Sequence, residues 1–177
     1  MHIAGYEEAT PCFLPKRQVY SLAESVANQL EHKPGDDIHA LVERIGGTVT
    51  IQDTLMEDPE RSGSLYVEAH DDFRIIVPAH TSGVRDRFTI AHELGHYVLH
   101  YVWKHSHDEN PPKRMYALRK GSERVEWEAN WFASGFLMPE AHFREAFQRL
   151  RSTAAVAAEL DVSLPAAEIR ARQLGLA

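Results

Sequence analysis

Residues 88–99 read Phe88-Thr89-Ile90-Ala91-His92-Glu93-Leu94-Gly95-His96-Tyr97-Val98-Leu99 and carry the strongest signal in this chain. Their centre is His-Glu-x-x-His, a pattern in which one helix supplies two zinc ligands. Residues four apart on a helix are rotated by roughly 40° and share a face, so His92 and His96 can direct a ring nitrogen at the same metal ion. Glu93 projects from the adjacent edge of that face, where it can act as general base toward a water molecule on the metal. The pattern predicts one Zn2+ per chain, with Glu93 as the catalytic residue.

The residues around this pattern predict a helix from near Val84 to about Trp103. Apolar side chains recur at helical spacing and form one stripe, which consists of Ala91, Leu94, Gly95, Val98 and Val102. Gly95 is a poor helix former, so its place between the two histidines predicts that another element packs closely there. The alternative is a buried helix whose histidines only form hydrogen bonds.

The composition is that of an ordinary globular protein. The chain has 177 residues, of which 44% are hydrophobic and 25% charged, enough for one domain with its own core. The formal net charge of −7 argues against direct binding to nucleic acid. A single cysteine, Cys12, excludes an internal disulfide and is typical of a reducing compartment. Because no apolar run is long enough for a membrane span and the N-terminus lacks signal-peptide features, we expect a cytoplasmic protein without membrane contact.

The segment before the pattern is predicted to contain two helices and then three strands. In chain order it comprises an irregular arm (1–17), a helix (18–32), a helix that begins at Asp36 or Asp37 and ends at Ile45, a strand (48–52), an acidic loop (55–61) and two strands (64–69 and 73–77). The last two strands are joined by a short turn and form an antiparallel pair. Either of them could hold an extended substrate by strand addition, with an ordinary sheet edge as the alternative.

The segment after the pattern is predicted to be mainly helical. It comprises a polar, proline-broken loop (104–121), a helix from Ser122 and Glu123 to Leu137, helices at 140–149 and 152–160, and a last helix that ends at Leu174. The fold class is therefore α+β, a single domain in which a small antiparallel sheet packs on several helices and the C-terminal half is rich in helix. We expect the main domain over 18–139 and the C-terminal helices, 140–177, packed on it.

A catalytic zinc site usually has a third protein ligand and leaves its fourth position to water. Glu126 is the preferred candidate, because Asn130 shares its predicted helix face and can accept the N–H of a ligand histidine. Glu128 points roughly 200° away from Glu126 on a helical wheel, so only one of the two carboxylates can bind, and Glu128 stays open as the alternative. His100 lies four residues beyond His96, and a straight helix carries it about 6 Å further along the axis, which favours a packed neighbour over a ligand.

Three further side chains are candidates for stabilising the oxyanion of a hydrolysis reaction. His105, His107 and Tyr116 lie in the predicted loop and could move over the metal, with a plain surface position as the alternative for each. Cys12 could bind the zinc as an inhibitory thiolate, and the alternative is a partly buried, inert cysteine.

Two blocks of the sequence resemble the ImmA/IrrE metallopeptidases. They are the segment 87–96, which contains the His-Glu-x-x-His pattern, and Glu126-Trp127-Glu128-Ala129-Asn130-Trp131-Phe132-Ala133 followed by Leu137-Met138-Pro139. The resemblance covers roughly residues 47–139, and the tail over 156–176 is similar to the family's C-terminal helices. It implies a zincin-like domain of bacteria or their mobile elements, with His92, His96 and Glu126 as zinc ligands and Glu93 as base.

The resemblance also implies a protein partner, since family members cleave or otherwise inactivate a helix-turn-helix repressor; an antitoxin is a related possibility. The leading hypothesis is a zinc-dependent endopeptidase that cleaves the repressor and derepresses its genes. One alternative is a non-catalytic, zinc-stabilised module that sequesters the repressor, and another is a zinc enzyme that acts on small peptides or amides. Three protein ligands favour catalysis, because a structural zinc usually has four.

Overall fold

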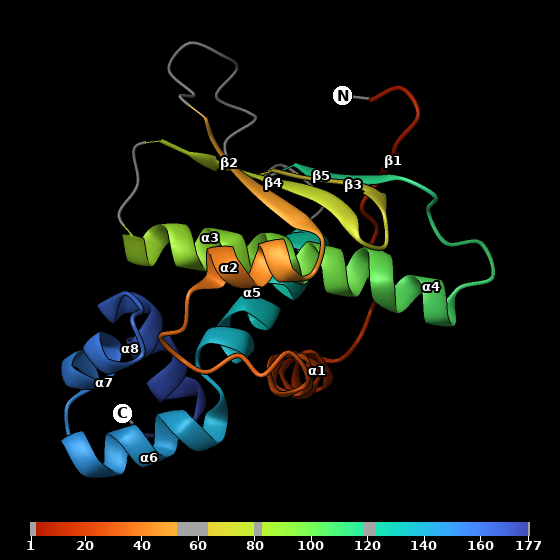
Figure 1. Ribbon diagram of the computed structural model, residues 1–177. Coiled ribbons are helices and arrows are strands. Elements are labelled where there is room, and N and C mark those ends of the chain that lie inside the picture. The colour runs from red at the N-terminus through yellow and green to blue at the C-terminus, as the bar shows by residue number, and fades with distance from the viewer. Residues whose placement is uncertain (1–2, 53–63, 80–82, 119–122, 177) are drawn as a thin grey trace.

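The computed structural model describes residues 3–52, 64–79, 83–118 and 123–176. Its described strands form one sheet in the order β1–β5–β3–β4–β2, and the helices lie on one side of that sheet (Figure 1). The strands are β1 (Glu7–Glu8), β2 (Gly47–Gln52), β3 (Ser64–Ala69), β4 (Asp72–Pro78) and β5 (Met115–Leu118). The predicted α+β class is confirmed. The predicted acidic loop, 55–61, and the last residues of the predicted loop, 119–121, lie outside the described ranges.

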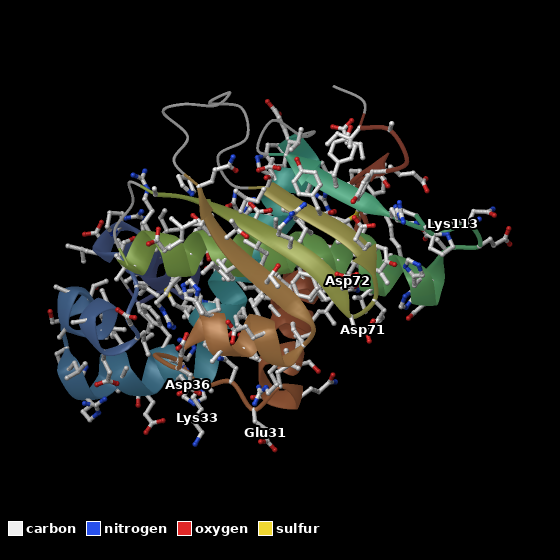
Figure 2. All side chains as sticks on the ribbon, turned by 45° about the horizontal axis from the view of Figure 1, so that its top comes forward. Glu31, Lys33, Asp36, Asp71, Asp72 and Lys113 are labelled. Carbon is white, nitrogen blue, oxygen red and sulfur yellow. The ribbon has the colours of Figure 1, made fainter. Side chains whose placement is uncertain are left out.

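β3 and β4 form the antiparallel hairpin that the sequence predicts. Leu65 pairs with Ile75, and both side chains are fully buried. Buried and more exposed residues alternate along β4, because successive side chains of a strand point to opposite faces of the sheet. Figure 2 shows Asp71 and Asp72 where the chain turns from β3 into β4, and both residues are exposed.

The sheet is mixed rather than purely antiparallel, because its outer strands run parallel to their neighbours. β2 pairs in parallel with β4, and β1 pairs in parallel with β5. β1 lies within the predicted irregular arm and β5 within the predicted loop 104–121, so both expectations are corrected here. β1 has 2 residues and β5 has 4, too few for either to show a period in the sequence.

The two strands proposed to hold an extended substrate are interior strands. β3 lies between β5 and β4, and β4 lies between β3 and β2. Their backbone N–H and C=O groups therefore have partners on both sides, so that prediction is wrong and neither strand can accept an added one. The sheet edges in the described part of the chain belong to β1 and β2. The residues of β1 fall within the predicted irregular arm, and β2 is predicted from the sequence as a strand without a named pairing partner.

The described helices agree with the predicted ones within a few residues. They are α1 (Lys16–Gln29), α2 (Ile38–Arg44), α3 (Gly83–His96), α4 (Trp103–His107), α5 (Glu123–Leu137), α6 (Glu140–Leu150), α7 (Thr153–Glu159) and α8 (Leu164–Gln173), with a π-helical segment, η2 (Tyr97–Val102), between α3 and α4. Asp37 caps α2 by accepting hydrogen bonds from two backbone N–H groups of its first turn. The helix predicted to end near Trp103 continues through η2 and α4 to His107, which shortens the predicted loop at its start.

A buried arginine ties the C-terminal helices to the rest of the chain. Arg170 of α8 is 3% exposed, and its Nε donates to the carbonyl oxygen of Met138 at 3.0 Å. Its guanidinium also lies 3.2 Å from the carboxylate of Glu24 on α1. A buried cation is stable only with such partners, so these contacts hold α8 against α1 and the end of α5. No helix in the described part of the chain has both the length and the apolar character needed to cross a lipid bilayer.

Candidate metal centre

The site lies where α3 packs on α5. An added Cβ atom at Gly95 would lie 3.0 Å from the carbonyl oxygen and 3.1 Å from the Cα atom of Ala129, so even an alanine would require the neighbouring backbone to give by a few tenths of an ångström. The close approach that the sequence predicts at Gly95 is therefore confirmed. Figure 1 shows α5 below α3, on the side away from the sheet. This packing brings the histidines of α3 against Glu126, near the start of α5.

Three side chains direct their ligand atoms at one point between these helices. The Nε2 atoms of His92 and His96 are 3.0 Å apart. In the Glu126 carboxylate, Oε2 lies 3.3 Å from His92 Nε2, and Oε1 lies 3.4 Å from His96 Nε2. Both imidazoles are buried, whereas 18% of the Glu126 side chain is exposed, so the point is accessible from the Glu126 side. We call these three residues the front cluster.

The spacing of these atoms fits a tetrahedral metal ion. Zinc binds imidazole nitrogen and carboxylate oxygen at about 2.0–2.1 Å, which places two ligand atoms of a tetrahedral site about 3.3–3.4 Å apart. Glu126 Oε1 is buried and accepts no hydrogen bond from the described residues, so it keeps a lone pair for a cation. The front cluster could therefore hold one zinc ion with three protein ligands.

Burial and neighbouring charges set the protonation of the front cluster. Burial opposes a charge on His92, but its contact with Glu126 and the charges of Glu93 and Glu126 outweigh that effect and raise its pKa. Burial lowers the pKa of His96, with a further contribution from the nearby His92 and His100. Burial would raise the pKa of the Glu126 carboxyl group, but the two histidines lower it well below its usual range. An ionised carboxylate thus faces a neutral imidazole, a combination that suits a cation.

Two further residues that the sequence singled out lie beside the front cluster. Asn130 is one turn beyond Glu126, and its Oδ1 lies 3.0 Å from Nδ1 of His92, where it can accept the ring N–H and leave Nε2 for a metal. Glu93 is 2% exposed on α3, and its charge acts on His92. Asn130 thus lies where an outer partner of His92 was expected, and the role of Glu93 as general base stays a prediction.

A second group of polar side chains lies directly behind His96. His100 Nδ1 is 3.1 Å from His96 Nδ1, and His100 Nε2 is 3.0 Å from Glu128 Oε2. Glu128 also accepts hydrogen bonds from the backbone N–H of Cys12 at 2.9 Å and from Nε of Arg124 at 2.8 Å. We call His100, Glu128, Cys12 and Arg124 the rear cluster. Glu128 and His100 thus face each other, and the structure places Glu126 rather than Glu128 beside the two motif histidines.

The rear cluster combines an ionised carboxylate with a neutral thiol. Burial would raise the pKa of Glu128, but hydrogen bonds from His100, the Cys12 N–H and Arg124 lower it to about 2. Burial, assisted by the charge of Glu128, raises the pKa of the Cys12 thiol to about 12. Cys12 therefore lies behind the front cluster as a protonated thiol, which does not fit an inhibitory thiolate on the metal.

The other candidates from the sequence lie away from the front cluster. His105 and His107 are on α4, about two to three turns beyond the motif on the same continuous helix. Their Nδ1 atoms lie 2.8 and 2.7 Å from the carbonyl oxygens of Tyr101 and Trp103, one turn earlier. Tyr116 is in β5 and is buried in the sheet. The structure does not bring these three side chains to the front cluster, because helix and strand occupy what was expected to be loop.

Arg124 is a neighbour of the site that the sequence interpretation missed. Besides its contact with Glu128, its guanidinium donates to the carbonyl oxygen of Leu14 at 2.7 Å. A signal was present, because arginine and glutamate four apart on a helix commonly pair. The sequence does not reveal that the segment around Cys12 folds back onto this pair, in which Glu128 is fully buried.

A helix with His-Glu-x-x-His, a glutamate from a second helix and a small sheet packed above define a zincin-like fold. The family model described as the IrrE N-terminal-like domain, a peptidase family, matches residues 50–172. The chain belongs to this family, which confirms the resemblance noted in its sequence.

The fold is also found among solved structures. A chain named as a Mycobacterium tuberculosis transcriptional regulator matches with a TM-score of 0.57 and 18% sequence identity, over 85% of this chain and 45% of that chain. The present chain therefore spans less than half of that protein's length, and a likeness at this identity concerns the fold. A comparison with curated protein sequences finds no match.

Proposed function

We propose that this chain is a zinc-dependent endopeptidase that hydrolyses a peptide bond in a helix-turn-helix transcriptional repressor. The observation that carries the proposal is the convergence of His92 Nε2, His96 Nε2 and the Glu126 carboxylate, with separations of 3.0–3.4 Å. Three protein ligands leave a coordination position for water, as catalytic zinc requires. Membership of a peptidase family supports hydrolysis, and the repressor as substrate follows from the resemblance to ImmA/IrrE proteins.

The side chains around the front cluster supply the remaining chemistry. Zinc held there would lower the pKa of a water molecule and polarise the carbonyl group of the substrate. Glu93 would accept a proton from the attacking water and deliver it to the leaving amine. Asn130 would keep the ring of His92 oriented by accepting its Nδ1–H. His92 must be neutral to act as a ligand, and its raised pKa in the metal-free chain means that a proton competes with the metal for this ring.

The test compares Glu93→Gln with the wild type for zinc content and for proteolysis. Zinc is measured by elemental analysis, and cleavage of a peptide library and of purified candidate repressors is measured by mass spectrometry. We expect one zinc in both proteins and cleavage only by the wild type, because the amide cannot take up a proton. His105→Gln is the control, since it changes the same continuous helix away from the site and should alter neither result. A Glu93→Gln protein that still cleaves would contradict the proposal.

The same experiment separates the two alternative functions. A wild-type protein that binds a repressor and leaves it intact would be a zinc-stabilised binding module. Turnover of short peptides without cleavage of any repressor would indicate a small-peptide hydrolase.

A further inference from the structure

A continuous series of hydrogen bonds runs from His96 into the interior of the protein. His96 Nδ1 lies 3.1 Å from His100 Nδ1, and His100 Nε2 lies 3.0 Å from Glu128 Oε2. The three residues are at most 1% exposed, so water does not compete for these contacts. The series leaves His96 from the ring nitrogen opposite to Nε2, the atom that faces the front cluster.

The far end of the series is fixed from two sides. Oε1 of Glu128 accepts a hydrogen bond from Nε of Arg124, and Oε2 accepts one from the backbone N–H of Cys12. Arg124 is itself held by the carbonyl oxygen of Leu14. Glu128 thus connects α5 to the segment before α1 and to η2, and its carboxylate cannot turn without breaking these contacts.

The chemistry of the groups fixes the direction of each hydrogen bond. Arg124 Nε and the Cys12 N–H can only donate, and between them they contact both oxygens of Glu128, so Glu128 acts as acceptor and the ring hydrogen of His100 must be on Nε2. A neutral imidazole has one N–H, which leaves Nδ1 of His100 as an acceptor. The hydrogen between the two rings must then belong to Nδ1 of His96, and Nε2 of His96 carries a lone pair directed at His92 and Glu126.

We propose that His100 and Glu128 are positioning residues, which hold His96 in the tautomer and orientation that make Nε2 a metal ligand. A neutral imidazole that carries its hydrogen on Nε2 could not bind a metal through that atom. Asn130 has the same role for His92, since its Oδ1 lies 3.0 Å from His92 Nδ1. The consequence for metal binding rests on the proposed zinc site, whereas the assignment of the tautomer does not.

By its residue types the rear cluster could instead hold a second metal ion, because Cys12, His100 and Glu128 place ligand atoms close together. Its contacts argue against that use. The His100 nitrogens and the Glu128 oxygens all lie within hydrogen-bond distance of a partner. Arg124 already supplies a positive charge to Glu128. A cation would have to displace these donors, so the cluster is suited to orienting His96 rather than to binding metal.

The first test reads the tautomer in the metal-free protein. Two-bond 1H–15N correlation spectra distinguish which ring nitrogen of a neutral histidine carries the hydrogen. We expect Nδ1–H for His96 and Nε2–H for His100 in the wild type, and loss of the His96 preference in His100→Phe and in Glu128→Gln. A wild-type His96 with its hydrogen on Nε2, or a preference unchanged in both variants, would refute the proposal whether or not the protein binds zinc.

The second test measures zinc affinity by competition with a chromophoric chelator. Loss of such an outer partner typically weakens metal binding about 10- to 100-fold, which we expect for both His100→Phe and Glu128→Gln. His32→Phe is the matched control, because His32 is also buried but stacks on Phe136, and it should change the affinity less than about twofold. Unchanged affinity in both rear-cluster variants, or two zinc ions in the wild type with one lost in His100→Phe, would overturn the proposal. If wild-type protein binds no zinc at all, the proposed function fails, and the tautomer measurement still decides the present inference.

Discussion

The front and rear clusters contain nearly the same types of metal-binding side chain, yet the front cluster suits a metal ion and the rear cluster suits hydrogen-bond donors. Each combines imidazole and carboxylate groups from the same continuous helix and from α5, and each could hold a metal ion by its residue types alone. In the front cluster the ligand atoms converge on one point, and Glu126 Oε1 accepts no hydrogen bond from the described residues. In the rear cluster Glu128 accepts hydrogen bonds from three donors, one of them a guanidinium.

This difference indicates that residues of ligand type suit a metal ion where hydrogen-bond donors do not already occupy their lone pairs. His96 belongs to both environments, since Nε2 faces the front cluster and Nδ1 faces the rear one. In the proposed arrangement the rear cluster orients the front cluster through successive hydrogen bonds. Arg124 fixes Glu128, Glu128 orients His100, and His100 orients His96. Variants that act on one cluster alone can test this division.

The largest expected effect is the loss of zinc when Glu126 is replaced. Glu126→Ala removes one of three ligands, so zinc affinity should fall by more than the roughly 100-fold that an outer partner costs, and elemental analysis after dialysis should find no zinc. Glu128→Ala should still retain zinc under the same conditions, with weaker affinity. Retention in Glu126→Ala together with loss in Glu128→Ala would exchange the roles assigned to the two clusters.

The next largest effect concerns the dependence of stability on pH in the metal-free protein. The pKa of Glu128 is lowered from 4.5 to about 2, so its ionised form stabilises the fold above pH 4.5 and this contribution is lost as the pH falls toward 2. A shift of this size corresponds to at most about 3–4 kcal/mol of unfolding free energy.

Urea unfolding of the wild type and Glu128→Gln measures this contribution. The wild type should exceed the variant by the largest margin near neutral pH, and the margin should shrink as the pH is lowered below 4.5. If the difference in unfolding free energy between wild type and variant were the same at neutral pH as it is well below pH 4.5, Arg124, Cys12 and His100 would not hold the carboxylate ionised.

Packing at the crossing of α3 and α5 gives a smaller effect on both clusters together. Gly95→Ala would place a Cβ atom 3.0 Å from the backbone of Ala129, so α5 must shift, at a cost of about 1–3 kcal/mol. Gly83→Ala is the matched control on the same helix, because nothing lies within 4 Å of its Cβ position. Thermal unfolding should show a lower midpoint for Gly95→Ala alone, with weaker zinc binding because Glu126 moves with α5. Equal midpoints for both variants would show that the contact is not tight.

Much of this arrangement could be predicted from the sequence, because local patterns carry it. The spacing of His92 and His96 fixes their common face, and the four-residue spacing of Glu126 and Asn130 fixes theirs. Gly95, between the histidines, predicts the close approach of another element, and its contact with Ala129 of α5 confirms this. The hairpin of β3 and β4 follows from its alternating residues and short turn.

The rest depends on contacts between segments that are distant in the sequence. β1 and β5 are too short to show a pattern, and they become strands only through pairing: β5 pairs with β3, and β1 pairs with β5. The π-helical turn of η2 has no signal in its apolar residues. The rear cluster requires the segment of Cys12 and Leu14 to reach Glu128 and Arg124, more than 100 positions away.

The smallest expected effect comes from the one cysteine, and it tests whether the rear cluster is a hydrogen-bond network or a metal site. The main contact of Cys12 with Glu128 comes from its backbone N–H, which Cys12→Ala preserves. The neutral thiol adds only a weaker contact, so its removal should lower the unfolding free energy by about 1 kcal/mol or less and leave zinc content unchanged. Urea unfolding and elemental analysis measure the two quantities. A cysteine that served as a ligand would instead be ionised, and Cys12→Ala would then bind one metal ion fewer per chain than the wild type. That result would place a second metal ion behind His96, and the two clusters would then both be metal sites.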